Sequence, residues 1–249
     1  MTSLKNKVVL VTGSARGIGK AIAIRYGSLG ASVVVNYSTD GKRAQETVEE
    51  IKRADTISIA VQADILKVAD IDRLFAAALD KFGPLDIVVA NAGVELVGQS
   101  VPVFTEVDFD RLFGINNKGA FFTLQKTAKH VADNGRIIYT GSSSTAFPLL
   151  GLALYGGSKL APQFLVEVLA KEIGHRGVTV NSILPTATES AGVYGDGVST
   201  DFRNFIKSFR PMQRMGTPSD VANAAEYLAG DMAAFMSGQH LLVTGGAPA

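Results

Sequence analysis

The chain has 249 residues, no cysteine and a formal net charge of +1, with charged residues making up 19% of the total. The lack of cysteine excludes a disulfide framework and a thiolate metal site, and the mixed, nearly balanced charges argue against a nucleic-acid partner. No uninterrupted apolar run approaches the roughly 20 residues that a membrane helix needs, and the N-terminus lacks the apolar core of a secretory signal. We therefore expect a cytoplasmic protein that does not enter a membrane.

Strands and helices are expected to alternate along the whole chain. Short β-branched runs predict strands, and apolar residues at helical spacing predict helices. The expected strands are 8–11, 33–35, 57–61, 87–89, 136–140, 178–184 and 241–243. The expected helices are 21–29, 45–53, 71–82, 109–131, 155–173 and 219–228, with a short one near 202–209. This alternation predicts one doubly wound α/β domain over residues 1–249, with about seven parallel strands and helices on both faces.

A glycine-rich turn joins the first expected strand to the first expected helix, and reads TGSARGIG over residues 12–19. Glycines let the backbone approach a diphosphate closely, and the N-terminus of a helix attracts negative charge. The strand before and the helix after are the context that a dinucleotide-binding turn requires. A plain strand-to-helix turn is the alternative interpretation.

Tyr155 and Lys159 are spaced i, i+4 on an expected helix, so both side chains share one face. A free phenol has a pKa near ~10, and an ammonium ~5 Å away would lower it by roughly 2. That change would favour general acid–base catalysis near neutral pH. On spacing alone, a surface pair on an amphipathic helix is the better interpretation.

Several motifs in this order resemble the short-chain dehydrogenase/reductase family over nearly the whole chain. They are TGxxxGxG at 12–19, NAG at 91–93, Asn116, Ser142 thirteen positions before Tyr155, YxxxK at 155–159, and Pro218, Asp220 and the glycine pair at 245–246. The resemblance implies a Rossmann-type domain, a nicotinamide cofactor and a catalytic set of Asn116, Ser142, Tyr155 and Lys159.

The roles of these four residues are also implied by the resemblance. Tyr155 would donate a proton to the oxygen of a carbonyl that receives hydride from the cofactor, and Ser142 would hydrogen-bond the same oxygen. Lys159 would tune Tyr155 and bind the nicotinamide ribose, while Asn116 would hold a water in a proton relay. Ser143, Ser144 and Asn117 are competing neighbours, and position relative to Tyr155 selects Ser142.

The segment after the second expected strand favours NADPH over NAD. It has no acid where the ribose 2′-hydroxyl is usually held, and Asp40 comes only three positions later. Arg16 stands in the glycine turn, where family members bind the 2′-phosphate; a solvated turn residue is the alternative. Asp64 resembles the family's adenine contact, and a helix N-cap is its alternative. The residues expected to bind the cofactor are Gly13, Ser14, Arg16, Gly17, Ile18, Gly19, Asn36, Tyr37, Ser38, Asp64, Ile65, Asn91, Ala92, Gly93, Tyr155, Lys159, Pro185, Thr186, Thr188 and Ser190.

The irregular segment at about 185–215 is expected to cover the substrate. The family commonly has Pro-Gly at its start, whereas this chain has Thr186, whose backbone must then avoid positive φ. Apolar residues expected near the pocket are Phe147, Leu149, Leu150, Leu154, Tyr194, Phe202 and Phe205, which could equally be core or subunit interface. They favour a small hydrophobic ketone or its alcohol as substrate.

Alternative functions stay open. Residues 131–135 lack the basic residue that reductases of acyl-carrier-protein substrates usually show, yet Arg176 matches a second basic position of those enzymes. An NAD-linked alcohol dehydrogenase and, last, a non-catalytic nucleotide-binding regulator are further alternatives. The three histidines, 130, 175 and 240, show no metal-binding spacing, so no metal is expected. Apolar helices around Phe121 and Phe164 predict a homotetramer.

Overall fold

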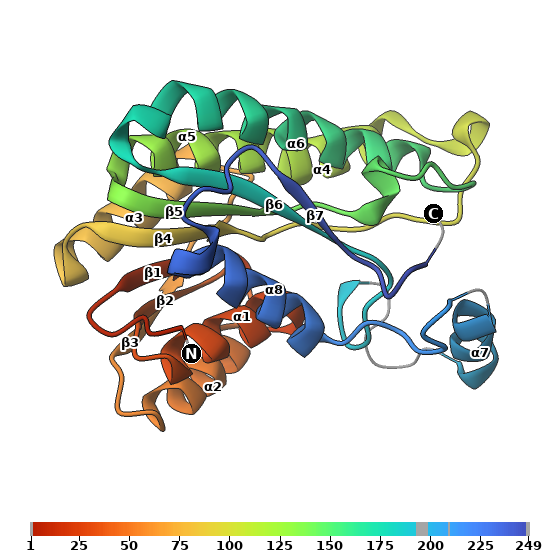
Figure 1. Cartoon of the computed structure of the whole chain (residues 1–249). Helices are drawn as coiled ribbons and strands as arrows, with labels where there is room; N and C mark the ends of the chain where they lie inside the picture. Colours follow the sequence, from red (N-terminus) through yellow and green to blue (C-terminus); the bar gives the residue numbers. More distant parts are fainter. Residues whose placement is uncertain (1, 193–198, 209, 248–249) are drawn as a thin grey trace.

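The structure is a computed structural model that describes residues 2–192, 199–208 and 210–247. Its centre is a seven-stranded parallel sheet with the strand order β3-β2-β1-β4-β5-β6-β7 (Figure 1). The strands are β1 (Val8–Val11), β2 (Ser32–Tyr37), β3 (Ser58–Gln62), β4 (Leu85–Ala90), β5 (Val131–Thr140), β6 (Thr179–Pro185) and β7 (His240–Val243). The predicted fold class, a Rossmann-type α/β sheet of about seven parallel strands, is confirmed.

Helices cover both faces of this sheet. Figure 1 shows α1 (Gly17–Ser28), α2 (Gly41–Lys52) and α8 (Pro218–Ala229) on one face. On the other lie α3 (Val68–Phe82), α4 (Glu106–Leu112), α5 (Ala120–His130) and α6 (Ala153–Ile173). The short helix α7 (Thr200–Ser208) stands apart from the sheet, at the lower right of Figure 1. No helix among the described residues is both long and apolar enough to cross a membrane.

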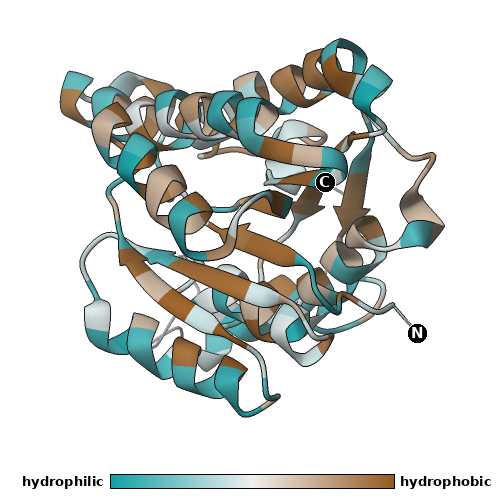
Figure 2. Cartoon of the chain, turned by 90° about the vertical axis from the view of Figure 1, so that its left-hand side faces the viewer, coloured by the Kyte–Doolittle hydropathy of each residue, from teal (hydrophilic) through white to brown (hydrophobic). Residues whose placement is uncertain are grey.

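The core lies between the sheet and its two helical layers. The central strands are apolar runs such as VVLV in β1, which is buried on both faces as the strands of a covered parallel sheet should be. One apolar cluster joins β1 and β2 to α1, α2 and α8, and two others join the opposite face to α3, α5 and α6. Figure 2 shows these hydrophobic strands enclosed by helices of mixed polarity.

The predicted single helix over 109–131 is wrong in detail. The chain instead forms α4, a π-helical segment over Phe113–Gly119, and α5. Thr105 starts α4 early because it forms a capping box with Asp108. Apolar periodicity does not reveal a π-helical turn, because the turn preserves a helical pattern on both sides. Such turns often occur at functional sites.

β5 begins earlier than the predicted residue 136. Leu85 pairs with Val131 whereas Ile87 pairs with Arg136, so residues 132–135 form a bulge in the strand. Asn134 lies in this bulge with φ of +61°, which explains why the sequence there does not read as a strand. Helix α2 starts four residues before its predicted first residue, because its first turn is polar; it begins at Gly41 after the N-cap Asp40.

The topology fixes the place of a ligand cleft. β1 lies between β2 and β4, so the connections that leave β1 and β4 diverge at their carboxyl ends. Ligands of open α/β sheets bind at such a switch point. In this chain the glycine-rich turn after β1 and the NAG motif after β4 meet there.

Candidate active site

The glycine-rich turn packs directly against the loop that follows β4. Gly13 has φ of +61°, and a Cβ on it would lie 2.9 Å from the Cα of Ala92. The Asn91 side-chain amide donates to the carbonyl oxygens of Thr12 at 3.0 Å and Gly13 at 3.2 Å. Thr12 Oγ1 accepts from the backbone amides of Asn91 at 2.9 Å and Ala92 at 3.0 Å. These contacts hold the turn open toward the cleft, where only glycine fits.

Two of the residues expected to bind the cofactor hold this turn in place. Asn36 is buried, accepts from the backbone amide of Gly13 at 3.0 Å and donates to the carbonyl oxygen of Ala63 at 3.0 Å. Ser14 Oγ donates to the carbonyl oxygen of Val11 at 2.7 Å and accepts from the amide of Asn36 at 3.1 Å. Their side chains therefore bond to the chain itself and position Gly13.

The other predicted cofactor residues line a cleft of about 900 Å³, and Asn36 borders it too. They are Gly13, Arg16, Gly17, Ile18, Gly19, Tyr37, Ser38, Asp64, Ile65, Asn91, Ala92, Gly93, Tyr155, Lys159, Pro185, Thr186, Thr188 and Ser190. Ser14 alone of the predicted set is absent from the lining. Asp64 accepts from the amide of Leu66 at 3.0 Å, whereas the N-cap of α3 is Lys67, so the N-cap alternative for Asp64 is not realised.

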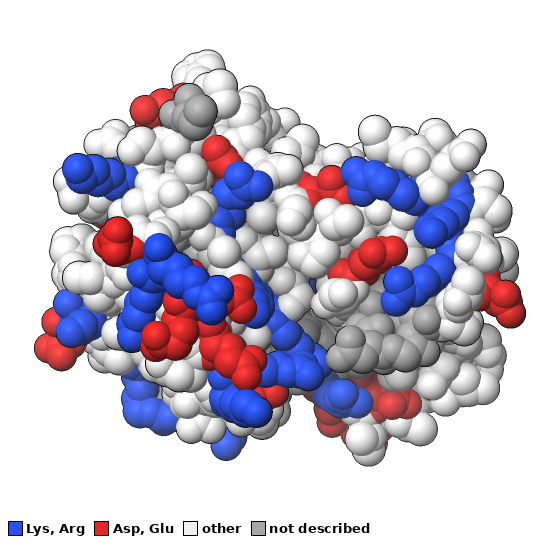
Figure 3. Space-filling view, turned by 90° about the horizontal axis from the view of Figure 1, so that it is seen from below, with Lys and Arg blue, Asp and Glu red and all other residues white. Residues whose placement is uncertain are grey.

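One end of the cleft, beyond β2, carries two arginines. Arg16 was expected there, whereas Arg43 in the first turn of α2 was missed. Arg43 Nε lies 3.4 Å from an Asp40 carboxylate oxygen, and Asp40 caps α2 by accepting from the amide of Arg43 at 3.0 Å. Asp40 is a residue type that favours helix N-caps. It is the sequence signal that would have placed the start of α2, and with it Arg43, at this end of the cleft. Figure 3 shows the molecule from below the view of Figure 1. On the face toward the viewer, Lys and Arg side chains are interspersed with Asp and Glu side chains.

Lys159 is buried at the other end of the cleft. Its Nζ donates to the carbonyl oxygen of Thr140 at 3.1 Å and lies 5.5 Å from the centre of the Tyr139 ring. A Cβ on Gly93 would lie 2.8 Å from this Nζ, so the NAG motif passes directly over the lysine. Burial lowers the pKa of Lys159 to about 8, and the negative charge of Glu95 opposes this change.

Tyr155 lies one turn before Lys159 on α6 and is also buried, with 7% of its surface exposed. Burial, and next the negative charge of Glu95, raise the pKa of Tyr155 well above its ordinary value, while a hydrogen bond with Ser142 lowers it. The prediction that Lys159 brings the Tyr155 pKa toward neutrality is therefore wrong in direction. Desolvation of the phenol and the nearby carboxylate determine the direction of the change.

Ser142 is the serine that contacts Tyr155, as its position thirteen residues upstream suggested. Ser142 follows β5, and its Oγ accepts from the hydroxyl of Ser144 at 2.9 Å and from the amide of Ser144 at 3.2 Å. Ser142 therefore contacts Tyr155, and the two hydrogen bonds from Ser144 orient the Ser142 hydroxyl.

Asn116 lies fully buried in the π-helical segment. Its side chain accepts from the amide of Val94 at 2.8 Å and donates to the carbonyl oxygen of Val94 at 2.8 Å. It also donates to Ser158 Oγ at 2.9 Å, and Ser158 in turn donates to the carbonyl oxygen of Tyr155 at 2.7 Å. Asn116 therefore ties the loop after β4 to α6; its role in a proton relay stays a prediction.

Glu95 is a site residue that sequence reasoning missed. Its carboxylate accepts from the Tyr155 hydroxyl at 3.4 Å. On its other side it lies against Gly192, where a Cβ would overlap the carboxylate oxygens. An acidic residue two positions after the NAG motif, in the otherwise apolar stretch VELV, is the signal that could have identified it.

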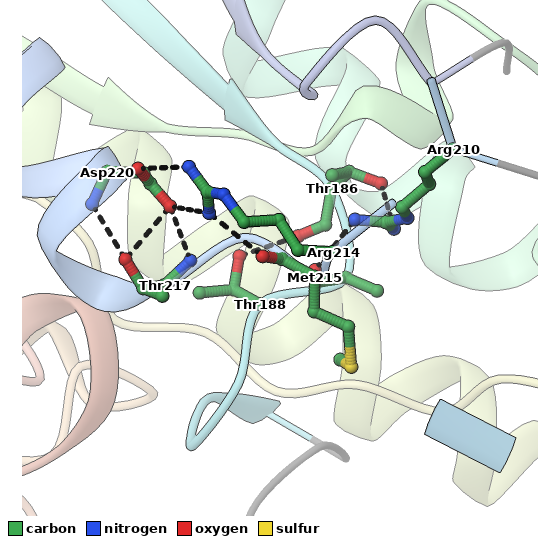
Figure 4. A network of polar contacts seen from close by, with 8 residues as sticks. Thr186, Thr188, Arg210, Arg214, Met215, Thr217 and Asp220 are labelled. Carbon is green, nitrogen blue, oxygen red and sulfur yellow. Dashed lines mark hydrogen bonds and ion pairs between the residues drawn. The ribbon is translucent and has the colours of Figure 1, made fainter. Parts of the chain in front are cut away.

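The segment after β6 is fastened at both of its ends (Figure 4). Thr188 forms a parallel bridge with Gly216, and the amide of Gly216 donates to the carbonyl oxygen of Ala187 at 3.2 Å. Arg210 is buried and donates to Thr186 Oγ1 at 2.9 Å. Thr186 is not among the residues with positive φ, which confirms that prediction; Ser190, with φ of +57°, is.

Arg214 and Asp220 extend this fastening to α8. Arg214 donates to the two Asp220 carboxylate oxygens at 2.6 and 2.9 Å, and dashed lines mark the ion pair in Figure 4. Asp220 also completes a capping box with Thr217 at the start of α8. The hydrogen bonds from Arg214 and Thr217 hold the pKa of Asp220 well below its usual range.

His240 joins three elements at the far edge of the sheet. Its Nδ1 lies 2.7 Å from Ser182 Oγ, and its Nε2 lies 3.0 Å from a Glu167 carboxylate oxygen. The order Ser-His-Glu is that of a hydrolytic triad, but Ser182 is fully buried in β6 and does not line the cleft. These contacts fasten β7 and β6 to α6.

Comparison with known proteins identifies this arrangement. A family model described as enoyl-(acyl carrier protein) reductase matches residues 13–248. The hydroxynaphthalene reductase-like protein Arp2 of Metarhizium acridum is 40% identical, over 98% of this chain and 96% of that protein. The chain belongs to the short-chain dehydrogenase/reductase family. As a member of this family, the protein is an NAD(P)-dependent oxidoreductase.

Solved structures of short-chain dehydrogenases/reductases agree closely with this fold. A short-chain dehydrogenase from Burkholderia cenocepacia, in complex with NADP, has a TM-score of 0.89 and 33% identity over 98% of both chains. The angucycline C-6 ketoreductase LanV, with bound NADP, has a TM-score of 0.92 and 31% identity over 99% of this chain and 97% of its own.

The expected apolar pocket of this short-chain dehydrogenase/reductase is only partly present. Phe147 and Leu149 line the cleft, whereas Leu150, Leu154 and Phe205 do not. Leu150 stands fully exposed on its loop and Phe205 is 63% exposed on α7. Tyr194 and the side chain of Phe202 lie outside the described residues. Apolar lining residues that were missed are Val97, Leu152 and Ile206.

Proposed function

We propose that the protein is an NADPH-dependent carbonyl reductase that converts a hydrophobic ketone into an alcohol, with Tyr155 as the proton donor. The observation that carries this proposal is the convergence of Tyr155, Ser142 and Lys159 on one wall of the cleft that the glycine-rich turn opens. Acids and bases that meet in a cleft with perturbed pKa values are typical of active sites.

The residues of the cleft fit a nicotinamide dinucleotide. The turn leaves no room for a Cβ at Gly13 or Gly19 and has positive φ at Gly13 and Gly17, so its backbone can meet a diphosphate at the N-terminus of α1. Arg16 and Arg43 would hold a 2′-phosphate, and bidentate arginine contacts suit that group. The cofactor, when bound, supplies the hydride. The NADP complexes of two structural neighbours support NADPH over NADH.

The chain's own residues would handle the proton. Because burial and Glu95 raise the pKa of Tyr155, its phenol stays protonated at neutral pH and can donate to the oxygen that becomes negative. Ser142 hydrogen-bonds the same oxygen, and Ser144 holds Ser142 in place. Lys159, still largely protonated near pH 7, would bind the ribose beside Gly93.

The substrate class follows from the apolar part of the lining. Phe147, Leu149 and Leu152 lie in the same cleft as Tyr155, and relatives are named for the reduction of hydroxynaphthalenes and angucycline ketones. The segment 185–215 would cover the substrate, and residues 1–249 would form a single domain. Arg176, which kept an acyl-carrier-protein substrate open, donates to Asp133 at 2.8 Å and to the carbonyl oxygen of Ala128 at 2.8 Å. Arg176 therefore binds a backbone carbonyl at the C-terminal end of α5, and its position does not support an acyl-carrier-protein substrate. A cytoplasmic location stays a prediction.

Oxidation of NADPH, followed by its absorbance with a panel of hydrophobic ketones, tests the proposal. We expect wild-type turnover, a loss of about 10²-fold or more in Tyr155→Phe, since general acid catalysis contributes on that scale, and slower turnover with NADH. NADPH binding by Tyr155→Phe, measured by fluorescence, should stay close to wild type. Equal rates for wild type and Tyr155→Phe would refute the proposed role of Tyr155.

A further inference from the structure

Glu95 places a carboxylate beside the proton donor of the reaction. Its Oε1 lies 3.4 Å from Tyr155 Oη. The preceding residue, Val94, is fixed through both backbone groups by Asn116, each at 2.8 Å. Gly192 closes the other side of the carboxylate. Glu95 is therefore held at the point where the loop after β4, α6 and the substrate segment converge.

This carboxylate opposes the reduction of a plain ketone. Tyr155 must turn its O–H toward the carbonyl oxygen, and negative charge then grows on that oxygen. An ionised carboxylate can only accept hydrogen bonds, so it repels the growing charge. A substrate group that donates a hydrogen bond to Glu95 would remove this penalty and replace the bond from Tyr155.

We propose that Glu95 selects ketones that carry a hydroxyl on the carbon next to the carbonyl, and in the reverse direction vicinal diols. The inference rests on the proposed carbonyl reduction. Because Tyr155 Oη and Glu95 Oε1 are 3.4 Å apart, a hydroxyl that reaches Glu95 while the carbonyl reaches Tyr155 must lie close to the carbonyl carbon. That carbon would receive the hydride that a bound nicotinamide cofactor supplies, Tyr155 would give its proton to the oxygen, and the hydroxyl would keep its own proton. The products are a vicinal diol and the oxidised cofactor.

A neutral hydroxyl suits this position better than an ammonium group. Lys159 is a buried cation close enough to Glu95 for the carboxylate to stabilise its charge. The charge of Glu95 already acts on Lys159, and a substrate cation at Glu95 would add a second positive charge near Lys159.

Three substrates of similar size test the proposal: α-hydroxyacetophenone, acetophenone, and α-methoxyacetophenone, which keeps the oxygen but has no donor. Their aromatic ring suits the lining by Phe147, Leu149 and Leu152. In Glu95→Gln, we expect kcat/KM for the hydroxy ketone to fall at least about ten-fold, the scale of a hydrogen bond to a charged group. Values for the other two ketones should rise, because the repulsive charge is gone.

Glu172→Gln, near the C-terminal end of α6 and exposed, is the matched control for loss of a carboxylate. It should leave all three values unchanged. A parallel fall for all three ketones in Glu95→Gln, or a change of less than about ten-fold in the ratio of hydroxy ketone to acetophenone, would overturn the proposal. Wild-type enzyme gives a test that needs no variant: it should prefer the hydroxy to the methoxy ketone by at least about ten-fold.

Failure of the proposed function is recognised separately. If wild-type protein reduces none of the three ketones, carbonyl reduction is refuted, and the role of Glu95 is then decided by binding. Calorimetric titration of 1-phenylethane-1,2-diol and 1-phenylethanol into protein loaded with NADP should show tighter binding of the diol, lost in Glu95→Gln. Equal binding of the two alcohols would refute that role as well.

Discussion

Two arginines at the β2 end of the cleft carry the proposed preference for NADPH. Arg16 comes from the glycine turn and Arg43 from α2, so both can reach one phosphate from different sides. Asp40 lies 3.4 Å from Arg43 and already balances part of that charge. Arg16 is therefore expected to contribute more to phosphate binding than Arg43.

Arg16→Ala is expected to weaken NADPH binding by about ten-fold or more, the loss typical of a charged hydrogen bond, and to leave NADH binding nearly unchanged. Arg43→Ala should have a smaller effect of the same kind. Fluorescence titration with both cofactors measures these changes. Arg53→Ala, exposed at the other end of α2, is the matched control. Equal losses for NADPH and NADH in Arg16→Ala would contradict the assignment.

Burial of Lys159 makes stability depend on pH. Its pKa is lowered from 10.5 to about 8, so between these values the unfolded chain holds a proton that the folded chain has released. The free energy of unfolding should therefore rise with pH across this window, by about 3 kcal/mol in total. Urea unfolding from about pH 7 to pH 9.5, below the range where buried tyrosines act in the opposite sense, should show about 2 kcal/mol of this rise. Lys159→Met should show a flatter profile, and parallel profiles would refute the explanation.

At the scale of elements, the ion pair of Arg214 and Asp220 joins the substrate segment to α8. Asp220 accepts from the amide of Thr217 at 2.8 Å and from Arg214 at 2.6 Å. Asp220→Ala should lower the free energy of unfolding by about 1–2 kcal/mol, through loss of the cap and of the ion pair. It should also raise KM for the ketone more than it lowers kcat, because the end of the segment 185–215, which would cover the substrate, is then held less firmly to α8. Urea unfolding and steady-state kinetics measure the two effects.

Asp231→Ala is the comparison for this change, since Asp231 is fully exposed and lies 4.0 Å from its partner Arg136. Little change is expected in either measurement. If Asp220→Ala altered stability but left KM untouched, the fastening would serve α8 alone.

Local patterns were sufficient to predict the order of strands and helices, because each buried strand is a continuous apolar run and each helix has an apolar stripe. The π-helical segment over Phe113–Gly119 and the bulge at 132–135 were not predictable in this way. The π-helical segment keeps a helical pattern on both sides, and the polar bulge residues interrupt the apolar run of β5, so neither feature can be read from local periodicity.

At the scale of the whole molecule, helices α5 and α6 expose large apolar side chains that a monomer would leave in contact with solvent. Phe121 on α5 is 41% exposed, and Leu160 and Phe164 on α6 are 51% and 65% exposed. We propose that these helices pair subunits in a homotetramer. Light scattering at micromolar concentration should give a mass of four chains, and Phe164→Glu should give smaller species. A monomeric wild-type protein would rule the tetramer out.

Contacts between distant segments explain which parts of the site could be predicted. Tyr155, Lys159, Ser142 and Asn116 were found because their spacing resembles a family pattern. Glu95 was not, because its role arises only where the loop after β4 meets Gly192, which is far along the chain. The pKa of Tyr155 is raised and not lowered as predicted for the same reason. Burial and the carboxylate of Glu95, which is far from Tyr155 in the sequence, decide its direction.

The fastening of the segment after β6 has a consequence for engineering. Its two feet, Thr188 paired with Gly216 and Thr186 paired with Arg210, lie close together beside the cleft. Between the feet, Ser190 lies against Gly17 of the glycine turn and Gly192 lies against Glu95, so these two residues should be kept when the rest of the stretch is exchanged for that of a relative. Chimeras that keep both feet should inherit the donor's choice of ketone and retain the cofactor affinity of this protein, which separates the two properties for directed evolution.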